Sequence, residues 1–585
     1  MTVESLITQH IDTWTSAVKT KSTSGRGSSK KLELYGVKKL RELILELAVR
    51  GKLVPQDPSD EPASVLLERI AAEKAQLVKD KKIKKSKALP SILDEDISVI
   101  LPNSWVIVRL GDICTKLTDG SHNPAKDAGS GYPMFSSQNV HFRSIDFTSP
   151  SRYVDEDNYL KEHARTQIEP RDILLTIVGT LGRAAVVPND APKFVLQRSV
   201  AVLQTKIDSD FLTYFLASPT CIKYFEENGK GTAQKGIYLG KLSLMPVFIP
   251  SREEQHRIVA KVDELMALCD QLEQQTEASI EAHQLLVCTL LNTLTNSADA
   301  DELMENWARI SDHFDTLFTT EESIDQLKQT ILQLAIMGKL VPQDPNDEPA
   351  SVLLERIAEE KAQLIKEKKI KKQKALPPIT DDEKPFDLPN GWEWARLSDI
   401  ANVIDPNPSH RMPKYVESGI PFISTENFTL DESINFDIGK KVTTAVLNDQ
   451  VSKFDLSEGA FAMSRIGTIG KTRFLPIERN YCMSHALCVI SPLVKLIDHQ
   501  YLKFVVSAES SLSQAHHGVK SIGVPDLGMG VIRSFLIPIP PKTKQELIVI
   551  NVESLLTICE NLKNRLKESQ ITQLHLTDAI VEQAV

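Results

Sequence analysis

Hydrophobic residues recur with a helical period in two long polar segments, one near the middle of the chain and one near its end. The first has apolar residues at positions 258, 262, 265, 269 and 272, and the second at 548, 552, 555, 559, 562 and 566. Alternating steps of four and three residues place these side chains along one helix face, as in a coiled-coil seam. We therefore predict a helix from Glu253 to about Leu294, roughly 60 Å long at 1.5 Å per residue. The matched Cys269 and Cys559 fall on the seams and are interpreted as small core residues.

A long internal repeat shows that the chain is built from two related halves. The segment Gly51–Ile92, which begins GKLVPQDPSDEPASVLLERI, returns at Gly338–Ile379 with six substitutions and an offset of 287 residues. Each copy predicts an amphipathic helix, which in the first copy starts at Pro62 and continues to Leu89-Pro90. Because the offset is far longer than the period of a solenoid, each copy is expected to belong to one half of a duplicated protein.

The pattern changes after residue 101 and again, with the same offset, after residue 388. LPNSWVIVRLGDI and LPNGWEWARLSDI open these regions, and short apolar runs separated by Gly, Pro, Asn and Asp follow. Such runs, for example 173–178, 184–187 and 194–202, predict strands in two mixed α/β domains. Trp105 and Trp392, which lie at the start of the two domains, are expected to anchor their cores. The sequences of the domains otherwise resemble each other only weakly, chiefly at 131–139 against 419–427 and at 179–183 against 467–471.

Composition and charge are those of an ordinary globular protein, with 41% hydrophobic and 25% charged residues. No apolar run approaches the roughly 20 residues needed to cross a bilayer, and the first residues do not resemble a signal peptide. Seven cysteines without paired spacing favour a reducing cytoplasm. The net charge of −10 argues against a protein that coats nucleic acid by charge alone, although it allows a specific reader whose partners add to the binding.

The motifs that would indicate an enzyme are incomplete. Gly467-Thr-Ile-Gly-Lys471 resembles the end of a phosphate-binding loop, but Arg465 stands where the pattern needs glycine. Cys482, His485 and Cys488 have ligand-like spacing but no fourth ligand, so a strand with buried cysteines is the favoured interpretation. Neither an adenine-methyltransferase motif nor a glycine-rich loop for a methyl donor is found. We expect no catalytic residue, no metal site and no cofactor in this chain.

The duplicated GKLVPQDP helix segment and the IP-x-x-x-x-Q-x-x-I-V turn-and-helix pattern together resemble the specificity subunit of type I restriction–modification enzymes. This resemblance covers the whole chain. It implies that the globular parts are target-recognition domains, each reading one half of a split, asymmetric sequence in double-stranded DNA. It also implies two modification subunits that use S-adenosylmethionine, and restriction subunits that translocate and cut DNA with ATP and Mg²⁺. None of that chemistry is expected in the subunit itself.

The fold class predicted on this basis is α+β. Two mixed α/β target-recognition domains in a pseudo-twofold arrangement are joined by long antiparallel coiled-coil helices. The expected segments are an N-terminal helical scaffold at 1–100, a target-recognition domain at 101–250, a central helical scaffold at 251–387, a second target-recognition domain at 388–540 and a terminal scaffold helix at 541–585.

Residues that contact bases are expected where matching loops differ in chemistry, because paired donors and acceptors distinguish the bases. Basic residues near the last strand of each domain are added to this set. The candidates are Gln138, Asn139, Arg183, Gln197, Arg198 and Lys235 in the first domain, and Glu426, Asn427, Lys471, Arg473, His485 and Lys520 in the second.

The function that we infer from the sequence is recognition of a DNA sequence within a multi-subunit methyltransferase and restriction complex. A coiled-coil scaffold that holds two protein partners without touching DNA is the alternative. A free-standing enzyme is a third hypothesis, which methyl transfer or cleavage by the purified chain alone would support.

Overall fold

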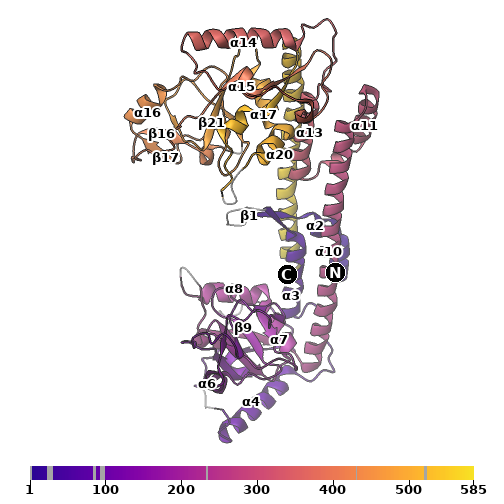
Figure 1. Ribbon diagram of the computed structural model, residues 1–585. Helices are drawn as coiled ribbons and strands as arrows, with labels where there is room; N and C mark the ends of the chain where they lie inside the picture. Colours follow the sequence, from indigo (N-terminus) through magenta and orange to yellow (C-terminus); the bar gives the residue numbers. More distant parts are fainter. Residues whose placement is uncertain are drawn as a thin grey trace. The chain divides into compact units, whose positions relative to one another are not determined.

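A computed structural model describes residues 3–22, 30–83, 87–92, 99–231, 235–429, 431–519 and 524–585. It divides into two compact units (Figure 1). Unit 1 consists of Met1–Ser279 together with Ser569–Val585, and unit 2 consists of Ile280–Glu568. Among the described residues, no helix has both the length and the apolar character that a membrane span requires.

Two long helices contribute to both units. They are α10 (Arg252–Asn296) and α20 (Lys542–Ala584). Unit 1 contains the start of α10 and the end of α20, and unit 2 contains the reverse. Helix α10 confirms the long helix predicted from Glu253 to about Leu294. Seam residues such as Ile258 and Ile548 are fully buried. Cys269 and Cys559 are buried on the seams as expected, and burial raises the pKa of both thiols to about 11.

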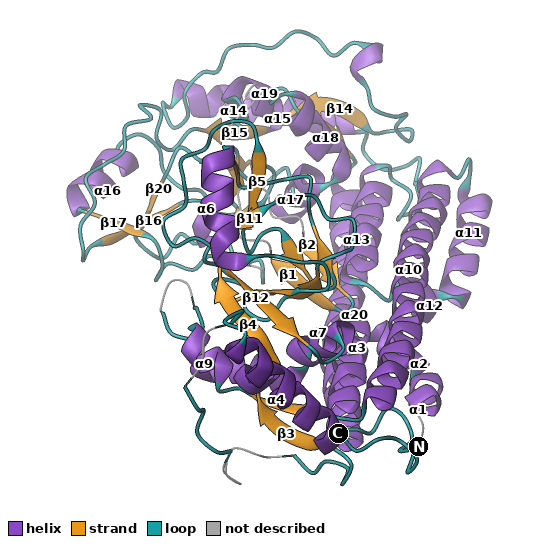
Figure 2. Ribbon diagram, turned by 90° about the horizontal axis from the view of Figure 1, so that it is seen from below, coloured by secondary structure: helices purple, strands orange, loops and turns teal. Residues whose placement is uncertain are grey.

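In unit 1, α3 (Tyr35–Val49) is attached to both long helices (Figure 2). Tyr35 Oη donates a 2.6 Å hydrogen bond to Asp578 on α20. Arg41 forms ion pairs of 2.7 and 2.6 Å with Asp270 and Glu273 on α10. The remaining scaffold elements of unit 1 are α1 (Val3–Gln9), α2 (Ile11–Ser16), the hairpin of β1 (Lys19–Ser22) and β2 (Lys30–Glu33), and α4 (Ala63–Lys79).

The described residues of unit 2 repeat this scaffold without the hairpin. Its helix α13 (Glu321–Ile336) corresponds to α3, and Asp325 on α13 is paired with Lys563 on α20 at 3.0 Å. His10 before α2 and His313 before α12 adopt nearly the same backbone angles, φ −117° and −116°. The other scaffold elements of unit 2 are α11 (Ala300–Asp312), α12 (Phe314–Leu317), α14 (Ala350–Lys366) and the short helix η2 (Asp381–Glu383).

The chain end in unit 1 takes the place of a continuous segment in unit 2. Lys52 Nζ donates to the Val585 carbonyl at 2.5 Å. Its repeat partner Lys339 donates to the carbonyls of Thr295 and Ser297 at 2.8 and 2.9 Å. Equivalent lysines thus hold the C-terminal turn of α20 in one unit and the C-terminal turn of α10 in the other.

The repeated helices α4 and α14 end earlier than the sequence pattern predicted. Each stops at a lysine, Lys79 or Lys366, about ten residues before the expected end. Lys81 and Lys368 then adopt left-handed backbone angles, φ 59° and 60°. The next amide, that of Lys82 in the first copy, donates back to Leu77 at 2.9 Å, which is the hydrogen bond of a Schellman motif that terminates the helix.

The described residues of the globular domain of unit 1 form three main sheets and a short hairpin in which β6 pairs with β7. A four-stranded antiparallel sheet has the order β10-β9-β12-β4, a three-stranded sheet has the order β11-β5-β8, and β13 pairs with β3. The apolar run 194–202, predicted as one strand, is divided by a loop at 197–199. The elements are β3 (Val106–Arg109), α5 (Leu110–Ile113), β4 (Cys114–Asp119), β5 (Tyr132–Phe135), β6 (Val140–His141), β7 (Ser144–Ile145), β8 (Arg152–Val154), α6 (Glu156–Thr166), β9 (Ile173–Thr176), β10 (Ala184–Val186), β11 (Val195–Leu196), β12 (Val200–Thr205), α7 (Ser209–Ala217), α8 (Pro219–Asn228), α9 (Leu239–Ser243) and β13 (Pro246–Ile249).

The globular domain of unit 2 repeats the four-stranded sheet, the three-stranded sheet and the pair formed by the first and last strands of the domain. Its sheets have the orders β15-β21-β18-β19, β17-β16-β20 and β14-β22. Trp105 and Trp392 are both buried, and their indole N–H groups donate to Glu254 at 3.1 Å and Gln343 at 2.9 Å. The elements are β14 (Glu393–Arg396), α15 (Leu397–Ile400), β15 (Ala401–Ile404), β16 (Ile420–Ile423), η3 (Thr425–Asn427), β17 (Lys440–Val442), α16 (Thr444–Val451), β18 (Phe461–Ser464), β19 (Thr472–Phe474), β20 (Cys482–Met483), β21 (Leu487–Pro492), α17 (His499–Ser507), α18 (Glu509–His517), α19 (Met529–Arg533) and β22 (Leu536–Ile539).

Candidate nucleic-acid interface

Loops from separate strands meet in the domain of unit 1 and are joined by backbone hydrogen bonds. Gln197 N donates to Phe135 O and Ile177 N donates to Ser199 O, both at 2.9 Å. Gly179 N donates to Lys235 O at 2.9 Å. We call this surface loop cluster 1, which comprises residues 119–122, 136–139, 177–183, 197–199 and 235–237.

The domain of unit 2 builds the same surface from a different sequence. Ser484 N donates to Ile423 O, Arg465 N to Ala486 O and Gly467 N to Pro525 O, each at 2.9 Å. Loop cluster 2 accordingly comprises residues 405–411, 424–427, 465–471, 484–486 and 524–527. Because the joining bonds are made by the backbone, the exposed side chains can differ between the clusters without loss of the arrangement.

The loops Gly179–Arg183 and Gly467–Lys471 place a basic residue at the same point of each cluster. All four glycines have positive φ, between 79° and 87°. A Cβ on Gly182 would lie 2.4 Å from the end of the Ile222 side chain, and one on Gly470 would lie 2.3 Å from the end of the Leu512 side chain, so a larger residue would displace these groups as well as strain the backbone. Arg183 N and Lys471 N then donate to the hydroxyls of Thr176 and Ser464, at 3.0 and 2.9 Å. The Arg183 side chain is half-buried and that of Lys471 is exposed.

The adjacent polar pairs Gln138-Asn139 and Glu426-Asn427 divide into an exposed and a buried member. Gln138 and Glu426 are exposed, whereas Asn139 and Asn427 are buried. The Asn139 amide accepts from Ser136 N at 3.0 Å and donates to the carbonyls of residues 146 and 149. The Asn427 amide accepts from Ser424 N at 2.8 Å and donates to the carbonyls of residues 435 and 438. Both asparagines therefore shape their loops from inside.

The remaining candidates are spread over several environments. Arg198 and Lys235 are exposed, whereas Gln197 is half-buried and donates to Ser151 Oγ at 2.8 Å. Arg473 is buried, and its guanidinium donates to the Thr472 carbonyl at 2.7 Å. Burial lowers the pKa of Arg473. Its guanidinium also donates to the carbonyls of residues 429 and 433 and so stabilises that loop from the interior. Lys520 lies outside the described residues.

His485 lies in the loop between two strands that carry buried cysteines. Cys482 on β20 and Cys488 on β21 are buried, as the sequence interpretation expected. Burial raises the pKa of these thiols to about 11 and about 12. Burial, followed by the neighbouring His410, lowers the pKa of the half-buried His485. Within the described part of the chain, no group of three or more His, Cys, Asp or Glu residues is arranged to hold a metal ion.

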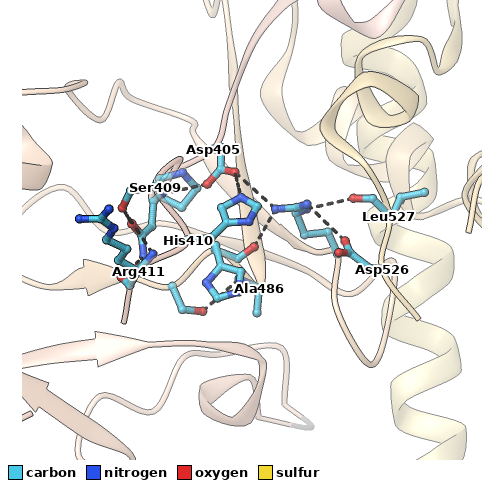
Figure 3. A network of polar contacts seen from close by, with 12 residues as sticks. Asp405, Ser409, His410, Arg411, Ala486, Asp526 and Leu527 are labelled. Carbon is cyan, nitrogen blue, oxygen red and sulfur yellow. Dashed lines mark hydrogen bonds and ion pairs between the residues drawn. The ribbon is translucent and has the colours of Figure 1, made fainter. Parts of the chain in front are cut away.

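An aspartate–histidine pair in each cluster was not singled out from the sequence. His122 Nε2 lies 2.7 Å from Asp119, and His410 Nε2 lies 3.1 Å from Asp405. Figure 3 shows the second pair. Arg465 also contacts Asp405 and donates to the His485 carbonyl. The available signal was a Ser-His dipeptide that follows an aspartate in both halves, as Asp119-Gly-Ser-His and Asp405-Pro-Asn-Pro-Ser-His. The different lengths of the two segments hide the correspondence from a comparison at fixed offset.

The chain resembles known proteins in sequence along its whole length. The profile of the type I restriction modification DNA specificity domain matches residues 102–282 and 389–573. The chain is 41% identical over 607 residues to the type I restriction enzyme EcoAI specificity subunit of Escherichia coli, with all of both chains covered. It is 39% identical over 603 residues to the EcoEI specificity subunit of the same organism, again with full coverage of both. The crystal structure of the HsdS subunit from Thermoanaerobacter tengcongensis shares 18% identity with it, with 83% of this chain and 98% of that chain covered and a TM-score of 0.33.

Proposed function

The chain belongs to the type I restriction modification DNA specificity family, and from this premise we propose that its two loop clusters read the two halves of a bipartite DNA target. In this proposal each cluster contacts one half of an asymmetric sequence in double-stranded DNA. The observation that supports it is the construction of the clusters. Equivalent backbone hydrogen bonds hold loops in the same arrangement, while the side chains that these loops present differ.

The exposed side chains have the chemistry that base recognition requires. Gln138 offers the paired donor and acceptor that suit adenine, whereas Glu426 at the matching place offers only acceptors, which suit cytosine. Arg198 suits guanine, and His485 takes its place in the second cluster. Because the two clusters present different side chains on the same backbone arrangement, the two domains would recognise different half-sites. Different half-sites are the expected property of an asymmetric target.

We propose that catalysis is performed by partner subunits. Modification subunits would supply adenine methylation with S-adenosylmethionine, and restriction subunits would supply translocation and cleavage with ATP and Mg²⁺, all in the cytoplasm. The net charge of −10 supports a need for partners, because non-specific attraction to DNA depends on positive charges that neutralise phosphates.

The repeated helices α4 and α14 support docking of two copies of one modification subunit. Buried positions of these helices have a packing reason to stay alike. The exposed Val65 and Glu68 nevertheless recur as Val352 and Glu355. A partner of one kind that contacts both copies would account for this identity.

A selection experiment tests the function. The full chain is assembled with its modification subunits and incubated with duplexes of random sequence, and the methylated molecules are sequenced. We expect one bipartite sequence with a gap of fixed length. Arg198→Ala should alter the preference in one half only, and His485→Ala in the other half only.

The alternative function, a scaffold that holds two proteins without reading DNA, predicts a different outcome. Methylated duplexes would then contain no shared sequence, and neither substitution would change the products. Methylation or cleavage by the purified chain without partners would instead support a free-standing enzyme.

A further inference from the structure

Loop cluster 1 holds an imidazole at its surface through a buried carboxylate. Asp119 is the last residue of β4, and only 10% of its side chain is exposed. One carboxylate oxygen accepts from Arg165 at 2.6 Å, and the other lies 2.7 Å from His122 Nε2. The His122 side chain remains 53% exposed. The ring is therefore fixed at one edge while the rest faces solvent.

Loop cluster 2 also holds an imidazole at its surface through a carboxylate, but residues from other elements form the contacts (Figure 3). Asp405 directly follows β15, with 12% of its side chain exposed, and lies 3.1 Å from His410 Nε2. Arg465 contacts Asp405 at 3.4 Å and Asp526 at 3.2 Å. The His410 ring stacks on that of His485 with centroids 4.9 Å apart, yet its side chain is 50% exposed.

Packing does not explain why both clusters hold this group. The arginine comes from α6 in one domain and from the loop after β18 in the other, and the histidine follows its aspartate by three residues in one case and five in the other. A half-exposed imidazole fills no core. The element common to both domains is an imidazole fixed by a carboxylate at the end of the first strand of the four-stranded sheet.

The carboxylate determines what the imidazole can offer to a ligand. A neutral ring whose Nε2 lies against a carboxylate carries its proton on Nε2, which leaves Nδ1 as a hydrogen-bond acceptor. Among the described residues, neither His122 nor His410 has a partner on Nδ1. In the major groove, an acceptor suits the exocyclic amines of adenine and cytosine, whereas the oxygens of guanine and thymine are themselves acceptors.

We propose that His122 and His410 are base-reading residues, each of which presents Nδ1 to the exocyclic amine of an adenine or a cytosine in its own half-site. The proposal rests on the proposed function of the clusters and adds two reading residues with a stated base chemistry. Asp119 and Asp405 are positioning residues, since they set the proton on Nε2 and do not face the base.

The test uses the full chain assembled with its modification subunits and the same random-duplex selection. His122→Ala should relax the preference for adenine or cytosine by about tenfold at one position of one half-site. His410→Ala should do the same at one position of the other half-site. Because both histidines are half-exposed, these variants are expected to fold, which thermal unfolding checks.

A second pair of variants tests the role of the carboxylates. Asp119→Asn and Asp405→Asn let the side-chain amide donate to Nε2, so that the proton can move to Nδ1. The same single position should then accept guanine or thymine about as well as adenine or cytosine. A purely structural aspartate would instead lower methylation of all sequences without altering any preference.

His256 is a matched control because it lies outside both clusters. Its Nε2 lies 3.7 Å from Asp208, and its side chain is 59% exposed. His256→Ala should change no preference. The inference is overturned if the unaltered complex selects a bipartite sequence and the His122 and His410 variants keep every preference, or if the affected positions prefer guanine or thymine. Failure of the unaltered complex to select any sequence would instead refute the proposed function.

Discussion

Replacement of Asn427 by alanine is expected to loosen one loop of the second domain without changing which base is preferred. The amide oxygen accepts from Ser424 N at 2.8 Å, and the amide nitrogen donates to the carbonyls of Asn435 and Ile438 at 2.8 and 3.0 Å. Asn427 is buried, and alanine at this position removes all three bonds that its amide makes with the Ser424 N–H and the two carbonyls.

The magnitude follows from the number of bonds. A buried hydrogen bond contributes on the order of 1 kcal/mol net, so the loop should lose about 3 kcal/mol of local stability. Because 1.4 kcal/mol corresponds to a factor of ten, the equilibrium constant for opening should rise by roughly a hundredfold. The effect should be confined to residues near 424–438, since the three bonds close that segment on itself.

Hydrogen–deuterium exchange measured on peptides gives the required resolution. The peptide that contains the Ser424 amide should exchange roughly a hundredfold faster in Asn427→Ala, while peptides from the four-stranded sheet keep their rates. Glu426→Ala is the matched control, because its exposed side chain makes only a 3.4 Å contact with the Ser424 hydroxyl. It should leave exchange unchanged and alter the base preferred at one target position.

The opposite pattern would refute this interpretation of the asparagine. If Asn427→Ala left exchange unchanged and switched a base preference, Asn427 would be a reader and the buried amide would not hold the loop. The same comparison in the first domain uses Asn139→Ala with Gln138→Ala as its control.

The other predictions concern the whole chain. Replacing residues 101–250 by the matching domain of a relative should change one half-site, and sequencing of methylated DNA that showed both halves changed would contradict independent domains. Four residues inserted after Leu272 lengthen α10 by about 6 Å, close to two base pairs at roughly 3.4 Å each, so the gap in the selected target should widen. Full activity with an unchanged gap would count against a helical ruler. A permutant that begins near Ala298, with Val585 joined to Met1 by eight residues, should keep its target, because Lys52 holds Val585 as Lys339 holds Thr295. A permutant that cannot assemble with its modification subunits would contradict this equivalence.

The long helices and most of the strands could be predicted because their signals are local. A four-and-three spacing of apolar residues is sufficient to place Ile258 and Val262 on a buried seam. By contrast, the ends of α4 and α14 depend on left-handed turns at Lys81 and Lys368, in residues with no sequence preference for that conformation. The loop at 197–199 between β11 and β12 was not predicted, because the residues on both sides of Gln197 and Arg198 form one apolar run. The residues at 194–196 and 200–202 are all buried.

The candidate site was predicted as a set of loops more successfully than as a set of side chains. Matching positions at a fixed offset identified the loops of Gln138, Arg183 and Glu426, which the backbone hydrogen bonds do bring together with their neighbours. Burial separates residues that look alike in sequence, so the asparagines beside Gln138 and Glu426 turn inward. The aspartate–histidine pairs depend on contacts between residues at unequal spacing, which a comparison at constant offset cannot align.

Unit 1 is assembled from two separate stretches of chain, whereas unit 2 is continuous. During translation, the residues that complete unit 2 are therefore made before residues 569–585, which complete unit 1. Until then Tyr35 and Lys52 lack their partners Asp578 and Val585. Domains generally fold in the order of synthesis, the N-terminal one first. Here the globular domain that is synthesised first belongs to the unit whose scaffold is completed last. A product interrupted before residue 569 would therefore contain a complete unit 2 scaffold and an incomplete unit 1 scaffold.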